Sequence, residues 1–158
     1  WNARVSNTPI FMGANIDNLS NQMKEIEKQG ISFLFIDTPP AITNSIKKVI
    51  SISDIVIIPT RPSPHDLRAV ARTVDLAEEE NKPIIFIING ASVRAKITSQ
   101  AAIALSQHGR VCPTIIHHRV DFASSMTDGR SVSEINANCK SASEILDSWN
   151  YIKNMLRK

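Results

Sequence analysis

Three short segments of this sequence are apolar along nearly their whole length, and segments with helical spacing separate them. The apolar segments are residues 31–36, 54–59 and 83–88. Strands without apolar–polar alternation are typical of parallel sheets, in which both faces of each strand are covered. Right-handed crossovers between parallel strands place the connecting helices on both faces of the sheet. The pattern therefore predicts an α/β fold with a mostly parallel sheet and helices on both faces.

Helical spacing and end signals predict the remaining elements. Gly30 and Gly109 are expected to end helices, and Ser63 to cap a helix that begins at Pro64. We expect helices over residues 17–29, 41–51, 64–80, 97–108, 121–127 and 141–156, and a fourth strand over 111–116. No glycine-, serine- or proline-rich linker divides the sequence, so a single domain over residues 1–158 is expected.

The composition restricts the class of protein. Of the 158 residues, 42% are hydrophobic, which is enough to build one core. The longest apolar runs are far below the roughly 20 residues that cross a bilayer. The two cysteines, Cys112 and Cys139, are too few for a disulfide framework. We therefore expect a cytoplasmic protein without a membrane span, with Cys112 as a small core residue.

Charge is distributed unevenly along the chain. Residues 1–90 contain nine Lys/Arg and ten Asp/Glu, whereas residues 91–158 contain nine and five. The basic second part is compatible with a nucleic-acid partner, although many proteins that bind no polyanion have a similar charge.

Ligands of parallel α/β proteins bind at the carboxyl ends of the strands. An Asp directly after an apolar strand, as at Asp37, has the form of a Walker B element, whose carboxylate orders Mg²⁺ and its waters near phosphates. Taken alone, such an Asp is more often a helix cap or a loop residue. The amide of Asn89 can donate to and accept from an adenine edge, although Asn-Gly is also a common turn. The adjacent His117 and His118 would point to opposite faces of a strand, so we do not expect them to form a metal site.

At this point the chain resembles the ParA/MinD group of deviant-Walker ATPases, which have a P-loop NTPase-like fold, and in particular the short ParA-type partition proteins. The segments that carry the resemblance are IDTPP at 36–40, DIVIIP at 54–59, SPHDL at 63–67, FIING at 86–90, and VDFA at 120–123 through DGRSV at 128–132. They resemble the Walker B segment, the next strand and helix start, the strand that recognises adenine, and the late loop that closes over the base. WNAR at 1–4 is similar to the residues directly after the first switch segment of the family.

The resemblance implies ATP or ADP and Mg²⁺ as cofactors of the intact protein. It places Asp37 and Thr38 at the magnesium-binding and catalytic position, and Asn89, Arg119 and Asp121 around the nucleotide. A surface ion pair would explain Arg119 and Asp121 nearly as well.

The resemblance also implies partners. They are a second copy of the chain in a homodimer, duplex DNA bound without sequence preference on the nucleoid, and a centromere-bound ParB-like protein. Phosphates of DNA are contacted through Lys and Arg, and binding releases counterions. The candidate residues are Arg94, Lys96, Arg130, Lys140 and Lys153, with Arg157 and Lys158 after them.

The chain departs from this family in its glycines. A phosphate loop needs closely spaced glycines followed by Lys and Ser or Thr, and none of the five glycines here precedes a Lys. We therefore expect the chain to be the C-terminal three-quarters of such a domain, without the first strand and the phosphate loop. By itself it should neither bind nor hydrolyse ATP. Because the resemblance puts the phosphate-loop strand beside residues 33–36, we expect a gap there, filled by other residues, another chain or a rearrangement.

Two alternatives remain open at this stage. One is a non-catalytic adaptor that keeps the fold and a partner surface without nucleotide chemistry. The other is a MinD-like positioning ATPase, whose last helix would lie on a membrane. The apolar side of that helix, which includes Ile145, Trp149 and Ile152, equally suits packing onto the sheet, and we favour packing.

Overall fold

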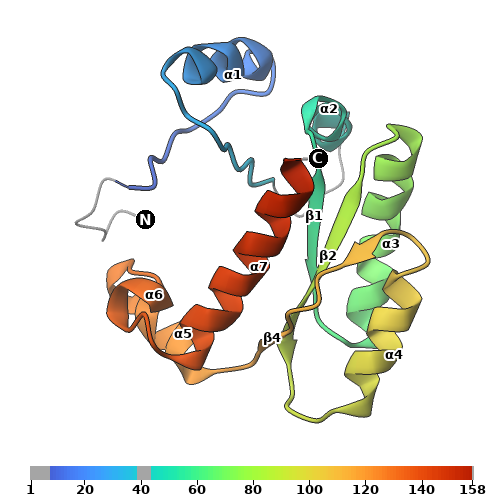
Figure 1. Cartoon of the computed structure of the whole chain (residues 1–158). Helices are drawn as coiled ribbons and strands as arrows, with labels where there is room; N and C mark the ends of the chain where they lie inside the picture. Colours follow the sequence, from blue (N-terminus) through green and yellow to red (C-terminus); the bar gives the residue numbers. More distant parts are fainter. Residues whose placement is uncertain (1–7, 39–43, 158) are drawn as a thin grey trace.

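The structure is a computed structural model, and it describes residues 8–38 and 44–157. Figure 1 shows the order of the elements along the chain. They are α1 (Leu19–Lys28), α2 (Asn44–Ile52), β1 (Val56–Thr60), α3 (Pro64–Glu79), β2 (Ile84–Ala91), α4 (Lys96–Leu105), β3 (Arg110–Val111), β4 (Ile116–His117), α5 (Val120–Ser125), the 3₁₀ helix η1 (Met126–Asp128), α6 (Val132–Ile135) and α7 (Lys140–Leu156).

The sheet is parallel and is centred on β2. β1 pairs with β2 along its whole length, from Val56 opposite Ile84 to Thr60 opposite Ile88. β3 and β4 pair with β2 over two residues each, also in parallel. Among the strands of the described chain, none pairs with the other edge of β1. One edge of this strand is therefore open.

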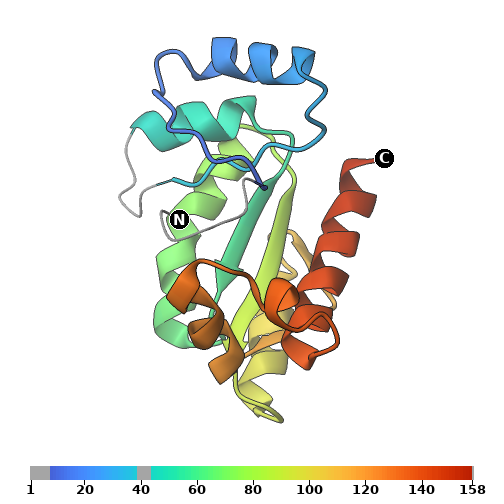
Figure 2. The same ribbon diagram turned by 90° about the vertical axis from the view of Figure 1, so that its left-hand side faces the viewer.

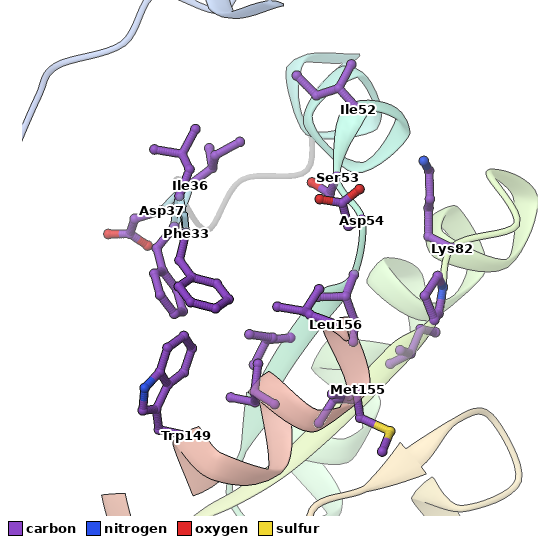
Figure 3. A pocket seen from close by; sticks show the side chains of 18 of the residues that line it. Phe33, Ile36, Asp37, Ile52, Ser53, Asp54, Lys82, Trp149, Met155 and Leu156 are labelled. Carbon is purple, nitrogen blue, oxygen red and sulfur yellow. The ribbon is translucent and has the colours of Figure 1, made fainter. Parts of the chain in front are cut away.

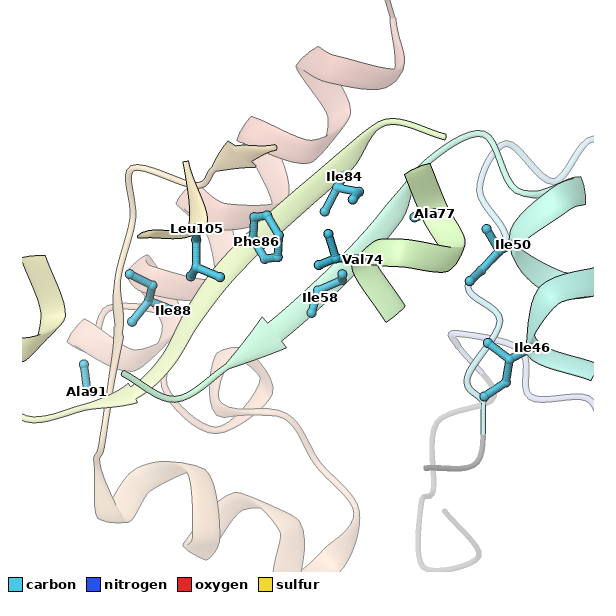
Figure 4. Close-up of a cluster of buried hydrophobic side chains, with 10 residues drawn as sticks. All are labelled: Ile46, Ile50, Ile58, Val74, Ala77, Ile84, Phe86, Ile88, Ala91 and Leu105. Atoms are coloured by element: carbon cyan, nitrogen blue, oxygen red, sulfur yellow. The ribbon is translucent and has the colours of Figure 1, made fainter. Parts of the chain in front are cut away.

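Side chains of β2 alternate between two hydrophobic clusters, as the period of a strand requires. Ile84, Phe86 and Ile88 belong to a cluster with residues of α2, α3 and α4 (Figure 4). Ile85 and Ile87 belong to a second cluster with residues of α7. Figure 2 shows α3 on one side of the sheet and α7 on the other. The predicted α/β class, with a mostly parallel sheet and helices on both faces, is confirmed.

The sequence signals at the start of α3 act as expected. The Ser63 Oγ accepts a hydrogen bond from the Asp66 N–H at 3.2 Å and donates one to the Asp66 carboxylate. Pro64 is the first helical residue, where its missing N–H has no cost, and the acidic Asp66 lies in the first turn, where the helix dipole favours it. These signals place the carboxyl end of β1 next to the start of α3.

The strand predicted over residues 31–36 is wrong. Residues 31–38 form neither helix nor strand, and Phe33 and Phe35 are 39% and 67% exposed. A strand needs a neighbour to satisfy its backbone groups, and this segment has none beside it in the described structure. Its aromatic rings instead pack on Trp149 of α7, with centroid distances of 4.9 Å for Phe33 and 5.6 Å for Phe35.

Other boundaries differ for local reasons. The strand predicted over 111–116 is split into β3 and β4, because Pro113 lies between them and lacks a backbone donor. The predicted helix over 97–108 ends at Leu105. The short helix α6 was not predicted, although Ser131 and Glu134 form a capping box that the sequence pattern contains.

Candidate functional site

The carboxyl ends of β1, β2 and β4 lie together at one end of the sheet, and ligands of such folds bind at this carboxyl end. The pairing of β2 with β4 is irregular there, because Asn89 lies opposite Ile116 while Ala91 lies opposite His117. Gly90, in the bulge between them, has φ +65°, a left-handed conformation that favours glycine. The Asn89 side chain is exposed at this end of the sheet. Its amide is therefore available to a ligand.

Arg61 follows β1 at the same carboxyl end of the sheet. A Cβ built on Gly90 would lie 3.6 Å from Arg61 Nε and 3.7 Å from Arg61 Cγ. The arginine side chain thus runs across the end of β2, over a residue that has no side chain of its own. In the described part of the chain, no carboxylate pairs with Arg61.

Arg119 is held by Glu144 of α7. Arg119 Nη2 donates to Glu144 Oε1 at 2.7 Å, and His117 contacts the same carboxylate through Nδ1 at 2.8 Å and its backbone N–H at 3.1 Å. The hydrogen bond that Arg119 donates to Glu144 raises the pKa of Arg119 above its usual value. Burial acts to raise the pKa of Glu144, but the hydrogen bonds from Arg119 and His117 outweigh it and lower that pKa.

Asp121 also has a partner on α7. Its carboxylate accepts a hydrogen bond of 2.7 Å from the hydroxyl of Ser141, which is fully buried in the first turn of that helix. Together with the contacts of Arg119, this bond fixes the start of α5 against α7. The two residues proposed for the late nucleotide loop are therefore held in place by protein contacts.

Asp37 and Thr38 lie in the segment 31–38, which forms no strand, so Asp37 is not at the end of a strand. Asp37 lines a cavity together with Ser53 and Asp54, and Asn89 is not among the lining residues (Figure 3). The described residues contain no cluster of three or more His, Cys, Asp or Glu side chains that could hold a metal. One carboxylate and a neighbouring hydroxyl fit a magnesium ion that is held mainly by nucleotide phosphates and water, which is how Mg²⁺ is commonly bound.

The cavity has a volume of about 1570 Å³. The segment 31–37 forms one wall, and β1, β2 and α7 form the others. Figure 3 shows Phe33 against Trp149 on one side and Met155 and Leu156 on another. Its walls are more apolar than polar, and it is open to solvent rather than enclosed.

The candidate DNA contacts come from several elements of the fold. Arg94, with φ +62°, lies in the turn before α4, and Lys96 begins that helix. Arg130 is paired with Asp128 at 2.7 Å, and this hydrogen bond lowers the pKa of Asp128. Lys140 is the first residue of α7, Lys153 lies 5.5 Å from the centre of the Trp149 ring, and Arg157 follows the last residue of that helix. Lys158 lies outside the described residues. About 20 Å of helix separates Lys140 and Lys153.

The structure also bears on the role of α7. Ile152 lies in the second core cluster with Ile85 and Ile87, and Trp149 packs against that cluster, so this part of the helix packs onto the sheet as favoured from the sequence. Ile145, on the same predicted side, is exposed instead. In the part of the chain that the structure covers, no helix is long and apolar enough to span a membrane.

Glu144 and Ser141 were missed by sequence reasoning, because their partners are 20 or more residues away in the chain.

Comparison with known proteins gives one distant similarity. No family model matches the chain. It is similar to a protein of Halothiobacillus neapolitanus (strain ATCC 23641 / c2) named Maintenance of carboxysome distribution protein A, with 23% identity over 153 residues. The similarity covers 91% of this chain and 70% of the relative. It supports a place for the chain in a ParA/MinD-like family.

Proposed function

We propose that the chain is the larger part of a ParA/MinD-type ATPase that partitions or positions a large cargo. The cargo is a plasmid or a chromosome, or a large assembly such as the one in the relative's name. In this proposal the 158 residues supply one side of the nucleotide site, and a longer product of the gene supplies the phosphate loop. The proposal rests on the resemblance of the segments around Asp37 and Asn89 and on the distant relative.

The observation that carries the proposal is the cavity beside residues 31–37. The family resemblance puts the phosphate-loop strand beside this segment, and the structure has an apolar space of about 1570 Å³ there together with the open edge of β1. A complete domain of this kind would fill such a space, since interiors are close-packed. The segment would then gain the neighbour that it lacks as a strand.

In the proposed site, each residue has a distinct role. Asp37 would orient the water shell of Mg²⁺, with the Thr38 hydroxyl beside it, and Asn89 would hydrogen-bond the adenine edge. Bound MgATP would supply the phosphoryl group that is transferred to water. Arg119 and Asp121 would shape the loop that covers the base, held by Glu144 and Ser141.

The finer parts of the proposal concern partners. We propose an ATP-dependent homodimer that binds duplex DNA without sequence preference and is stimulated by a centromere-bound partner. Of the candidate DNA contacts, Arg94, Lys96, Lys140 and Lys153 have no ion-pair partner in the described structure, whereas Arg130 is paired with Asp128. DNA affinity that does not fall with added salt would contradict phosphate contacts of this kind.

The test uses the longest product that the gene encodes. We expect it to hydrolyse ATP, and we expect Asp37→Asn to lower the rate by roughly 100-fold, because a group that stabilises the transferring phosphates is lost. Asp54→Asn is the matched control, since Asp54 lines the same cavity and should leave the rate unchanged. A gene product without a phosphate loop that neither binds nor hydrolyses ATP would overturn the proposal and favour the non-catalytic adaptor.

A further inference from the structure

We propose that Arg61 is a second base-reading residue, whose guanidinium plane covers one face of the nucleobase while Asn89 reads its edge. This inference rests on the proposed function, since it assigns a new residue to the same nucleotide site. It starts from the register of the two strands. Thr60 is paired with Ile88, so Arg61 and Asn89 are the next residues of two neighbouring parallel strands. Neighbouring strands lie about 4.8 Å apart, which puts the two backbones side by side at the carboxyl end of the sheet.

The side chain of Arg61 lies over Gly90 at the carboxyl end of β2. Its Cγ, Cδ and Nε atoms would lie 3.7, 4.0 and 3.6 Å from a Cβ on Gly90. These are ordinary contact distances, so the arginine stem rests on the glycine that directly follows Asn89. A larger side chain at position 90 would extend into the place that the arginine occupies, and the positive φ of Gly90 disfavours one as well.

The backbone of Arg61 is fixed from both sides. Its carbonyl oxygen accepts hydrogen bonds from the Ser63 N–H at 2.9 Å and from the Thr60 hydroxyl at 3.3 Å. Thr60 is buried, and Pro62 restricts the backbone conformation of Arg61 before it. An exposed side chain on a fixed backbone loses less freedom on binding than one on a loose loop.

Within residues 8–38 and 44–157, no carboxylate compensates the charge of Arg61, in contrast to that of Arg119 and Arg130. Glu144 pairs with Arg119 and Asp128 pairs with Arg130. The nearest acidic residue in sequence, Asp66, is engaged by Ser63. A planar guanidinium without a carboxylate stacks well on an aromatic ring, and proteins use this contact to hold nucleobases.

The combination of groups fits a nucleobase better than a bare anion. Asn89 offers a donor and an acceptor in one plane, which a phosphate cannot use fully because it only accepts. A purine offers both kinds of group along its edge and a π face above it. The two residues together therefore address the edge and the face of one planar ligand.

The experiment measures binding of ATP and of inorganic tripolyphosphate to the longest gene product by calorimetry. We expect Arg61→Ala to weaken ATP binding by roughly 5- to 150-fold, the range for loss of one stacking contact, and to leave tripolyphosphate binding unchanged. Arg61→Lys keeps the charge but not the plane, and we expect it to weaken ATP binding nearly as much. Arg72→Ala, on an exposed position of α3, is the control for removal of one positive charge.

The outcomes separate this inference from the proposed function. If the wild-type protein binds ATP and Arg61→Ala binds it equally well, the role of Arg61 is overturned and the proposed function stands. If Arg61→Lys restores full affinity, or if tripolyphosphate binding falls with ATP binding, a charge contact replaces the stacking contact and the inference is wrong. If the wild-type protein does not bind ATP, the proposed function fails and the role of Arg61 fails with it.

Discussion

At the scale of single residues, Glu144 joins more of the candidate site than any other side chain described above. Its carboxylate contacts His117 and Arg119 at the end of β4 from its position on α7, and its side chain is only 13% exposed. A carboxylate that accepts several hydrogen bonds is costly to replace, because its donors are then left without an acceptor. Sequence reasoning found Arg119 through a motif, but it could not find the residue that holds Arg119.

We expect Glu144→Gln to lower the free energy of unfolding by about 1–3 kcal/mol, measured by urea titration at pH 7. Asp147→Asn is the matched control, because Asp147 is an exposed acid on the same helix that accepts one hydrogen bond, from the Ser143 hydroxyl at 3.3 Å. The control should change stability by less than about 0.5 kcal/mol. Equal losses in the two variants would contradict the role of the Glu144 contacts.

The lowered pKa of Glu144 gives the same residue a dependence on pH. A carboxyl group whose pKa is lower in the folded state contributes stability above its unfolded value, here 4.5. That contribution is lost as the pH falls below 4.5 and through the lower folded-state pKa. The difference in unfolding free energy between the wild type and Glu144→Gln should therefore shrink between pH 5 and the acid end of the titration.

At the scale of elements, the sequence was reliable where a strand has neighbours within the described chain. The runs at 54–59 and 83–88 form β1 and β2 because they pair with each other and are covered on both sides. The run at 31–36 has the same composition but no neighbour to pair with, so its apolar residues pack on Trp149 instead. Composition thus predicted which segments prefer to be buried strands, and pairing decided which of them are strands.

The contact between residues 33–35 and Trp149 can be tested by fluorescence in a Trp1→Phe background. Phe33→Ala should shift the emission of Trp149 to longer wavelength and increase its quenching by acrylamide, because the ring loses its edge-to-face partner at 4.9 Å. The expected loss of stability is about 1 kcal/mol. Leu34→Ala is the control, since it removes an apolar side chain of the same segment without removing a ring contact. An unchanged spectrum for Phe33→Ala would show that the segment does not rest on α7.

At the scale of the whole molecule, the open edge of β1 lies beside a large and mainly apolar cavity. The Val56 N–H donates to Pro83 O at 2.9 Å, on the side of β2. Successive backbone groups of a strand point to opposite edges, so the N–H of Ile57 faces the open edge. Pro59 has the same orientation but no N–H. The open edge therefore presents a single donor, at Ile57, beside carbonyl acceptors.

This geometry makes Ile57 a reporter for whatever completes the sheet. In the 158-residue chain, we expect the Ile57 amide to exchange its hydrogen much faster than the Ile58 amide, which faces β2 on the same strand. In a longer gene product that fills the cavity with a parallel strand, Ile57 should gain a hydrogen bond, and its exchange should slow by roughly 100-fold or more while that of Ile58 changes less. Hydrogen exchange followed by NMR measures both amides in one experiment. Rapid exchange of Ile57 in the longer product would mean that the space beside β1 is not filled by a paired strand, and the domain would then have to close around its nucleotide in another way.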